Sequence, residues 1–413
     1  MAAYEKDLGS GLVLRSLRHE EDAAHFIALN AAVTDEGMIA ERLLSYHPDT
    51  NYDDYFLVVD EHTGQTVSTT CLLPWRCAYE DIILNVAMLE MVVTHPDYRH
   101  RGLVRAQIDH FHQVVDRRGF DLSIIQGIPY YYRQFGYAYA LDHTPQVSLP
   151  AGRIPEEPAN ASPAYRWRPA APADSDDLFH LYELAMAKTQ LYVQRSPAYW
   201  RYLLEYGPYS IRLIEDSRTG RAAGYLAISQ SDGRLSVQEN SLTGYDMGLA
   251  VLRQLKTEKA GEIRLVGSPA NRLVRLAHSL GSSSLPAYQW LWRIPDPVRF
   301  LTKISPVLER RLASGGCAGL TAKFSLNLYR RAYTLNFEAG SLAVEPLGFV
   351  DTSMGADGGD WCLPPEAFIR LSLGYRSLDQ LQDAWPDMLI KPASRYLLEL
   401  LFPQLEAAIL MPY

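Results

Sequence analysis

The stretch Met91-Val-Val-Thr-His-Pro-Asp-Tyr-Arg-His-Arg-Gly-Leu103 decides how the N-terminal third of this chain folds. An apolar strand end passes through a proline-containing turn into a short basic loop, and a helix follows. We predict that this helix runs from Leu103 to about Arg118, where Gly119 supplies a C-cap. Its apolar residues recur three and four positions apart, at Val104, Ile108, Phe111 and Val115.

The loop before this helix has the composition of a phosphate-binding site. The first N–H groups of a helix lack partners inside the helix, and the helix dipole favours anions. Gly102 lets the main chain approach a ligand closely, while Arg99 and Arg101 add positive charge for a pyrophosphate. An ordinary surface turn with solvated arginines is the alternative interpretation.

Together, the strand, loop and helix resemble the acetyl-CoA loop of the GCN5-related N-acetyltransferase (GNAT) superfamily, whose pattern is Arg/Gln-x-x-Gly-x-Gly/Ala. Arg99, Gly102 and Val104 stand at the three marked positions, and Val104 departs from the usual small residue. The resemblance implies acetyl-CoA as co-substrate. It assigns cofactor binding to Val92, Val93, Thr94, Arg99, His100, Arg101, Gly102, Leu103 and Val104.

Length and composition are those of a multidomain globular protein. With 413 residues, 47% of them hydrophobic and 21% charged, the chain should form two or three domains. No apolar run reaches the ~18 residues of a membrane helix, and the N-terminal residues lack a secretory pattern. Four scattered cysteines, Cys71, Cys77, Cys317 and Cys362, favour reduced thiols in a cytoplasmic protein.

The charge balance bears on the partner. A net charge of −9 argues against nucleic-acid binding, which needs basic patches, and no membrane partner is expected. It suits a cationic acceptor, such as a polyamine, a lysine side chain or an aminoglycoside, although it can equally serve solubility alone. His95, His100, His110 and His112 lack the further ligands of a metal site, so we expect no metal.

The chain divides into three predicted domains of a mixed α+β protein. Residues 1–152 have the element order of one acetyltransferase unit, in which residues 141–149 form the closing strand. A Pro- and Ala-rich stretch from Arg153 to Ser175 marks a boundary. Residues 153–294 repeat the element order, but the loop at 240–246 contains no arginine, so we expect a degenerate second copy without a cofactor.

The third predicted domain covers residues 295–413. A helix over 296–312 precedes a meander of strands near 322–328, 332–337 and 342–344, and three helices follow. This order and length resemble a sterol carrier protein-like α+β domain. Such a domain can hold a lipid or serve as a scaffold.

A second informative stretch is Gln126-Gly-Ile-Pro-Tyr-Tyr-Tyr-Arg-Gln-Phe-Gly-Tyr137. It follows the strand that should diverge from the strand ending near Val93, where a pantetheine arm would enter. Acetyl transfer to an amine must protonate the leaving thiolate, and a buried tyrosine can supply that proton. Packing explains Tyr130 and Tyr131, whereas we favour a chemical role for Tyr132.

The pattern from Tyr132 to Tyr137, the basic loop and the three-part layout are similar to the enhanced intracellular survival (Eis) family. That resemblance implies two tandem GNAT domains, the second inactive, and a sterol carrier-like C-terminal domain. It makes Tyr132 the general acid and the carboxylate of the last residue, here Tyr413, the general base. Where the family usually has Gly then Arg before Phe-Gly, this chain has Arg133 then Gln134. Family members also acetylate aminoglycosides and form hexamers, so a homo-oligomer is implied.

The expected activity is therefore direct acetyl transfer in a ternary complex, from acetyl-CoA to an amine of a small cation or a lysine-containing peptide. Asp35, Glu36 and Glu90 are candidate acidic contacts for that acceptor, although a charged surface explains each of them as well. A non-catalytic CoA- or lipid-binding scaffold is the competing function.

Overall fold

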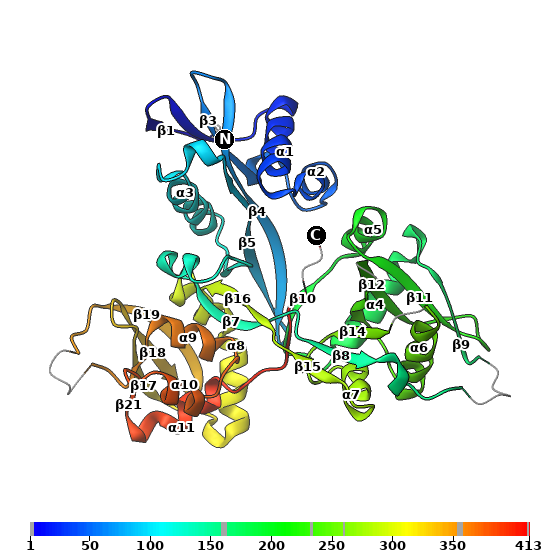
Figure 1. The fold of residues 1–413 in the computed structure, drawn as a ribbon. Coiled ribbons are helices and arrows are strands. Elements are labelled where there is room, and N and C mark those ends of the chain that lie inside the picture. The colour runs from blue at the N-terminus through cyan, green and yellow to red at the C-terminus, as the bar shows by residue number, and fades with distance from the viewer. Residues whose placement is uncertain (1–3, 158–162, 232–233, 259–260, 353–357, 411–412) are drawn as a thin grey trace. The chain divides into compact units, whose positions relative to one another are not determined.

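The computed structural model describes residues 4–157, 163–231, 234–258, 261–352, 358–410 and 413 (Figure 1). The chain forms two compact units. The first comprises Met1–Ala40, Thr50–Leu141 and Gln289–Leu405, and the second Glu41–Asp49, Asp142–Tyr288 and Glu406–Tyr413. The structure is of the predicted mixed α+β class. The three predicted domains, 1–152, 153–294 and 295–413, remain predictions.

A long mixed sheet runs through the first unit in the order β1-β2-β3-β4-β5-β6-β16-β7. These strands are β1 (Glu5–Gly9), β2 (Leu12–Ser16), β3 (Tyr55–Asp60), β4 (Gln65–Tyr79), β5 (Ile82–Thr94), β6 (Leu122–Ile125), β16 (Tyr288–Arg293) and β7 (Ala138–His143). From β1 to β5 every pairing is antiparallel, whereas β5 pairs with β6 in parallel. A parallel pair needs a crossover, which α3 (Leu103–Arg117) provides.

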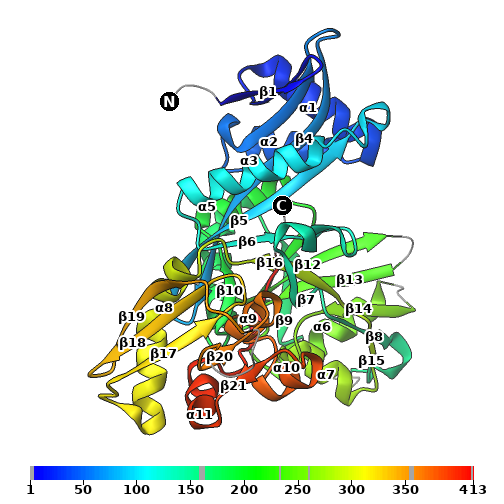
Figure 2. The same ribbon diagram turned by 90° about the vertical axis from the view of Figure 1, so that its left-hand side faces the viewer.

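Helices cover both faces of this sheet. In Figures 1 and 2, α1 (Glu20–Thr34) and α3 lie on opposite sides of β4 and β5. The predicted helix is confirmed: α3 begins at Leu103, ends one residue before Arg118, and buries Ile108, Phe111 and Val115. α2 (Gly37–Tyr46), which the sequence analysis missed, follows α1 after a left-handed residue at Asp35.

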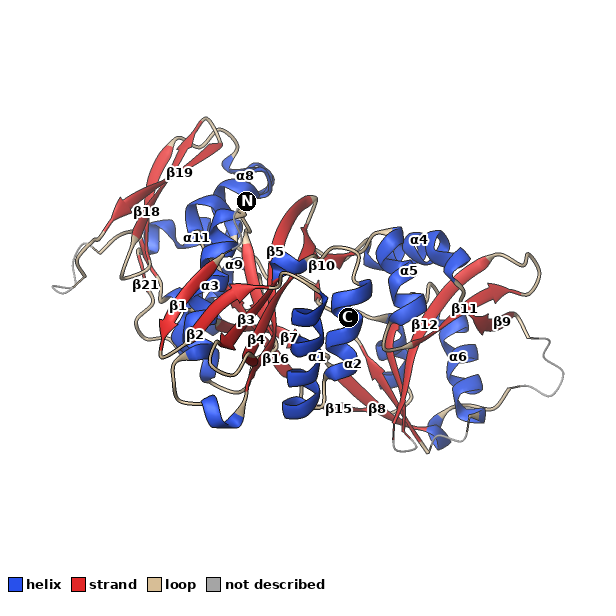
Figure 3. Cartoon of the chain, turned by 90° about the horizontal axis from the view of Figure 1, so that it is seen from above, coloured by secondary structure: helices blue, strands red, loops and turns tan. Residues whose placement is uncertain are grey.

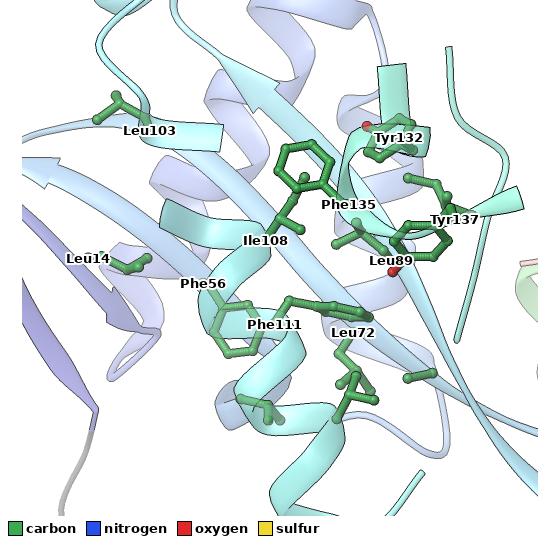
Figure 4. Packing of buried hydrophobic residues seen from close by; sticks show 14 of the residues in the cluster. Leu14, Phe56, Leu72, Leu89, Leu103, Ile108, Phe111, Tyr132, Phe135 and Tyr137 are labelled. Carbon is green, nitrogen blue, oxygen red and sulfur yellow. The ribbon is translucent and has the colours of Figure 1, made fainter. Parts of the chain in front are cut away.

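One core of the first unit lies between α3 and the sheet. Figure 4 shows the side chains of Phe135 and Tyr137 beside Ile108 of α3 and Leu89 of β5. All four side chains are buried. Aromatic residues that follow β6 therefore complete the core under the helix that carries the basic loop.

The closing strand expected over residues 141–149 was assigned incorrectly from the sequence. Residues 141–149 do not form one closing strand: they contribute to β7 and to β8 (Gln146–Pro150), and β8 pairs with β14 (Glu262–Val266) in the second unit. Conversely, β16 pairs antiparallel with β6 in the first unit. Periodicity locates strands but does not reveal their partners, so these pairings could not be predicted.

The second unit has its own sheet, ordered β15-β8-β14-β13-β12-β11-β9. Its remaining strands are β9 (Tyr165–Pro169), β11 (Ser210–Asp216), β12 (Ala222–Ser231), β13 (Arg234–Asn240) and β15 (Ser283–Leu285). Three antiparallel pairings lead to a parallel pairing of β13 with β14, joined by α6 (Tyr245–Thr257). This is the succession of strand directions from β2 to β6. Figure 3 shows α4 (Ser175–Met186) and α5 (Pro197–Tyr206) together beside this sheet, and α7 (Arg272–Ser279) follows β14.

Residues 297–405 add a third sheet to the first unit, in the order β19-β18-β17-β20-β21. Its strands are β17 (Ala322–Asn327), β18 (Ala332–Glu338), β19 (Ser341–Gly348), β20 (Trp361–Cys362) and β21 (Leu389–Ile390). Its helices are α8 (Pro297–Leu312), α9 (Pro365–Ser372), α10 (Leu378–Ala384) and α11 (Pro392–Leu401). The predicted helices and meander lie at these positions.

Two further observations concern the whole described chain. None of its described helices combines the length and apolarity needed to cross a membrane. Cys71, Cys77 and Cys362 are buried, as expected of core thiols, whereas Cys317 is partly exposed.

His110 is a buried histidine on the inner face of α3. Its ring stacks on Tyr4 at 3.6 Å and meets Phe56 edge-on at 4.7 Å, measured between ring centroids. Neither ring nitrogen has a hydrogen-bond partner among the described residues. Burial, assisted by the charges of Arg117 and Lys6, lowers the pKa of His110 to about 4. The folded protein therefore holds this ring neutral, without hydrogen bonds.

We expect His110→Phe to stabilise the protein, and more so in acid. At pH values between about 6.5 and the folded pKa of about 4, His110 binds a proton in the unfolded chain but not in the folded one. The free energy of unfolding therefore decreases as the pH falls through this range. Removing the unpaired ring nitrogens should contribute ~1 kcal/mol at neutral pH. Urea unfolding at pH 8 and pH 5 measures both effects. The exposed His25→Phe is the control, and an equal gain at both pH values would contradict the titration argument.

Candidate active site

The candidate site begins where two parallel strands separate. β5 pairs with β6 from Val86 to Met88, and beyond that point β5 continues to Thr94. The ladder between β5 and β6 therefore ends at Met88, one residue before the end of β6 at Ile125. The divergence of the two strands remains a prediction. A gap between parallel strands exposes main-chain groups that a bound chain-like ligand can use.

A β-bulge lies in β5 at this gap. Between the pairs Thr69–Val93 and Cys71–Glu90, β5 has one residue more than β4, and Met91 has a left-handed φ of 53°. The hydroxyls of Thr69 and Thr70 donate to the carbonyl oxygens of Met91 and Glu90, each at 3.1 Å. Bulges re-aim strands and often lie next to active sites. The sequence analysis missed this feature because methionine gives no signal for it.

After β5, the basic loop leads into α3 as predicted. Arg99, His100, Arg101 and Gly102 are exposed. Gly102 caps α3 with a φ of 77°, and an added Cβ would meet no neighbour, so the backbone conformation rather than crowding favours glycine there. The first amides of α3 thus stand beside exposed arginines, as a phosphate site requires.

Two side-chain contacts brace this loop from β3 and β4. The Tyr98 hydroxyl donates to Asp60 Oδ2 at 2.6 Å, and this hydrogen bond lowers the pKa of the Asp60 carboxyl. Below it, the Ser68 hydroxyl lies 2.7 Å from Thr94 Oγ1 and 2.7 Å from Gln107 Oε1 of α3. The end of β5 and the start of α3 are therefore fixed to the sheet.

Tyr132 occupies a short 3-10 turn, η3 (Tyr131–Phe135), after β6. Its ring is buried and meets the Tyr131 ring edge-on at 5.1 Å and that of Tyr137 at 6.3 Å. A Cβ at Gly127 would lie 2.1 Å from the Tyr132 ring, so only glycine allows this packing. Burial, and then the negative charge of Glu90, raise the pKa of Tyr132 well above its ordinary value. The charge of Glu90 therefore acts on the Tyr132 phenol.

Two adjacent residues of the turn, Arg133 and Gln134, take part in arginine contacts. Arg133 donates to both carboxylate oxygens of Glu366 on α9, each at 2.8 Å, so this departure from the family pattern has a structural partner. Arg105 of α3 donates to Gln134 Oε1 at 2.7 Å. No motif could have indicated Glu366, because it lies 233 residues from Arg133.

Behind Tyr132, the Tyr137 hydroxyl lies 2.8 Å from Ser123 Oγ of β6 and 3.4 Å from His112 Nε2 of α3. Burial raises the pKa of Tyr137 to about 12 and lowers that of His112 to about 3. Both side chains are therefore neutral near pH 7. We assign this group to support of the turn, since neither side chain can hold a charge there.

The second unit has a related loop with different chemistry. β13 carries a bulge between Val237 and Glu239, in the strand that corresponds to β5 by order and direction. The loop before α6 buries Ser241 and Leu242, and Gly244 caps the helix with φ −136°. Residues 240–246 contain no arginine, although Arg272 of α7 donates to the main-chain oxygen of Thr243. That this copy holds no cofactor remains a prediction.

The other predicted site residues are dispersed. Val92 and Thr94 are partly buried on β5 and Val93 is buried. Asp35 is exposed and Glu36 partly buried, between α1 and α2. Tyr413 belongs to the second unit, where its main-chain oxygen accepts a hydrogen bond from Arg42. The roles assigned to these residues remain predictions. Among the described residues, no group of three or more His, Cys, Asp or Glu could hold a metal ion.

Comparison with known proteins identifies the part of the chain that contains this geometry. Residues 14–140 match the acetyltransferase (GNAT) domain family. The match includes β5, the basic loop, α3 and the Tyr132 turn. No curated protein matches the chain in sequence.

Solved structures resemble the chain over almost its entire length. A probable N-acyltransferase from Enterococcus faecalis V583 has a TM-score of 0.74 at 14% identity, covering 97% of this chain and 100% of its own. A GCN5-related N-acetyltransferase from Kribbella flavida has a TM-score of 0.70 at 17% identity, covering 97% and 100%. Eis1 from Mycobacterium abscessus has a TM-score of 0.63 at 14% identity, covering 97% and 98%. At these identities the similarity establishes the fold.

We predict that acetyl-CoA binding requires the loop of the GNAT domain. Arg99→Glu with Gly102→Asp places negative charge at the start of α3 and should weaken binding by ~100-fold or more, as measured by calorimetry. The matched control is Arg218→Glu with Gly220→Asp, because Gly220 is also left-handed (φ 68°) and Arg218 is exposed. Unchanged stoichiometric binding by the first variant would refute the assignment.

Proposed function

We propose that the chain is an acetyl-CoA-dependent N-acetyltransferase that acetylates an amine of a cationic acceptor by direct transfer. The observation that supports this most is the position of Tyr132, buried next to the point where β5 leaves β6 and within the field of Glu90. The exposed arginines before α3 provide for the phosphates of the cofactor.

In the proposed reaction, the acceptor nitrogen attacks the thioester carbonyl carbon, the C–S bond breaks, and the thiolate leaves with a proton from Tyr132. The acceptor ammonium loses one proton to the base before attack, which frees the nitrogen lone pair, and a second from the tetrahedral adduct. One of these two protons replaces the one that Tyr132 gave to the thiolate, and the other is released to solvent. Its raised pKa keeps Tyr132 protonated at neutral pH, as a general acid requires. It also makes the phenol a weak acid, so donation must coincide with C–S cleavage.

For the base we propose the α-carboxylate of Tyr413, on the strength of the family resemblance. Arg42 would orient that carboxylate through the contact described above. Ile409, shortly before it, is buried, which suits a docked segment rather than a free one.

The acceptor is proposed to be cationic. The charge of Glu90 acts on the Tyr132 hydroxyl, so an ammonium group between them would meet an anion and a phenol. Asp35 and Glu36 are proposed as further acidic contacts for this acceptor. Polyamines, aminoglycosides and lysine-containing peptides all carry such a cationic amine.

We further infer a tandem architecture, in which the second unit is a GNAT-like copy without cofactor. Its strand directions from β9 to β14, its crossover helix and its bulge in β13 repeat those of the first unit. The resemblance also supports a sterol carrier-like C-terminal domain and a homo-oligomer such as a hexamer, and the scattered cysteines support a cytoplasmic location.

Tyr132→Phe tests the general acid. The substitution keeps the ring and removes the proton, so kcat should fall by roughly 10²–10⁴-fold while the affinity for acetyl-CoA changes little. CoA thiol release against a panel of aminoglycosides, polyamines and basic peptides measures turnover. Tyr131→Phe is the matched control in the same turn. Turnover equal to that of the unmodified protein would return Tyr132 to a packing role, and no turnover on any acceptor would favour the scaffold function.

Extending the chain beyond Tyr413 tests the base. A few added residues move the carboxylate away, so kcat should fall ~100-fold, with folding and acetyl-CoA affinity unchanged. The same residues added at the N-terminus serve as the control. Full turnover of the extended protein would exclude the carboxylate and leave an acidic side chain or a water chain as the base.

A further inference from the structure

The C-terminal segment 406–410 is docked on the second unit by main-chain hydrogen bonds. β22 (Ala407–Ala408) pairs in parallel with β10 (Leu191–Gln194). Just before it, the amides of Gln190 and Leu191 both donate to the carbonyl of Glu406, at 3.0 and 3.2 Å. This short pairing fixes where the segment starts but extends over only two residues of β22.

A buried ion pair holds the next residues. The Arg195 guanidinium, fully buried, donates to both oxygens of Glu239 on β13 at 2.7 Å, and the Tyr225 hydroxyl donates to the same carboxylate at 2.5 Å. Arg195 Nη2 also donates to the main-chain oxygen of Leu410 at 3.2 Å. One guanidinium therefore joins the bulged strand of the second sheet to the C-terminal segment.

The surroundings of this pair are apolar and aromatic. The guanidinium lies over the rings of Tyr182 and Trp200, at 4.5 and 4.9 Å from their centroids. A pocket beside it is lined by Trp200, Leu203, Pro208, Tyr209 and Leu410, among others. Burying two charges seldom gains stability over an apolar pair of similar volume, because desolvation offsets their attraction. Such a pair does, however, provide hydrogen bonds of fixed direction.

We propose that Arg195 is a positioning residue that anchors the C-terminal segment and thereby fixes Tyr413. Tyr225 donates to Glu239, Glu239 orients the guanidinium, and Nη2 of Arg195 makes a second hydrogen bond to the carbonyl of Leu410. Arg42 contacts the main-chain oxygen of Tyr413 itself. The link from Tyr413 to catalysis rests on the proposed function, whereas the anchoring does not. In this proposal the second unit carries the anchor of the C-terminal segment.

The test replaces the ion pair without leaving a buried charge. In Arg195→Met with Glu239→Gln, the new amide oxygen still accepts from Tyr225, but the donor to Leu410 is lost. Amide hydrogen exchange in peptides covering 407–410 measures how firmly this segment is anchored. We expect exchange to be ~10-fold faster or more in the double variant than in the unmodified protein. Melting of the same variant shows whether the fold as a whole is retained.

The matched control is Arg212→Met with Glu258→Gln, which removes an Arg–Glu pair of the same unit that touches no part of the C-terminal segment among its described contacts. The inference would be overturned if hydrogen exchange at 407–410 were unchanged in the Arg195 variant. It would also be overturned if exchange there rose by the same factor in the Arg212 control. Neither conclusion depends on the measured turnover.

Turnover of the same variants separates this inference from the proposed base. Faster exchange with kcat lowered ~10-fold and unchanged acetyl-CoA affinity supports both the anchor and the role of Tyr413. Faster exchange with unchanged kcat supports the anchor and counts against Tyr413 as the base, which the chain extension tests independently.

Discussion

Parallel strands β5 and β6 share hydrogen bonds only as far as Met88, and the main-chain groups of β5 beyond that point need other partners. On one side β4 supplies them, through the strand ladder and through the hydroxyls of Thr69 and Thr70 at the bulge. On the other side a ligand can approach. Tyr132, Phe135 and Tyr137, which follow β6 in the chain, pack in the same buried cluster as Leu89 of β5.

Tyr132 owes its chemistry to this arrangement. A phenol in solvent has an ordinary pKa, whereas here burial and then the charge of Glu90 raise the pKa of Tyr132, so that it is a weaker acid than a free phenol. The same packing requires glycine at 127 and an anchor for the turn, which the ion pair of Arg133 with Glu366 provides. That pair is about one-third exposed on each side, so we regard it as a guide for the turn rather than a large source of stability.

The sequence was sufficient for features that depend on local pattern. The helix from Leu103, its basic loop and most strands follow from periodicity and from a glycine at a left-handed position. The bulge at Met91 could not be predicted, since it arises from the register between β4 and β5 and no residue type signals it. Nor could the partners of Arg133 and Arg195, because ion pairs between distant segments depend on tertiary packing that single-sequence patterns do not contain.

The pairing of β16 with β6 has a consequence for biosynthesis. β6 ends at Ile125, but its antiparallel neighbour begins only at Tyr288. At a translation rate of ~5–20 residues per second, the ribosome needs roughly 8–30 s to make the intervening segment. Throughout that interval one edge of β6 has no strand beside it, and unpaired edges invite association with other chains. The N-terminal sheet is therefore complete only after most of the chain has been synthesised, and a chaperone that shields this edge would raise the yield of native protein.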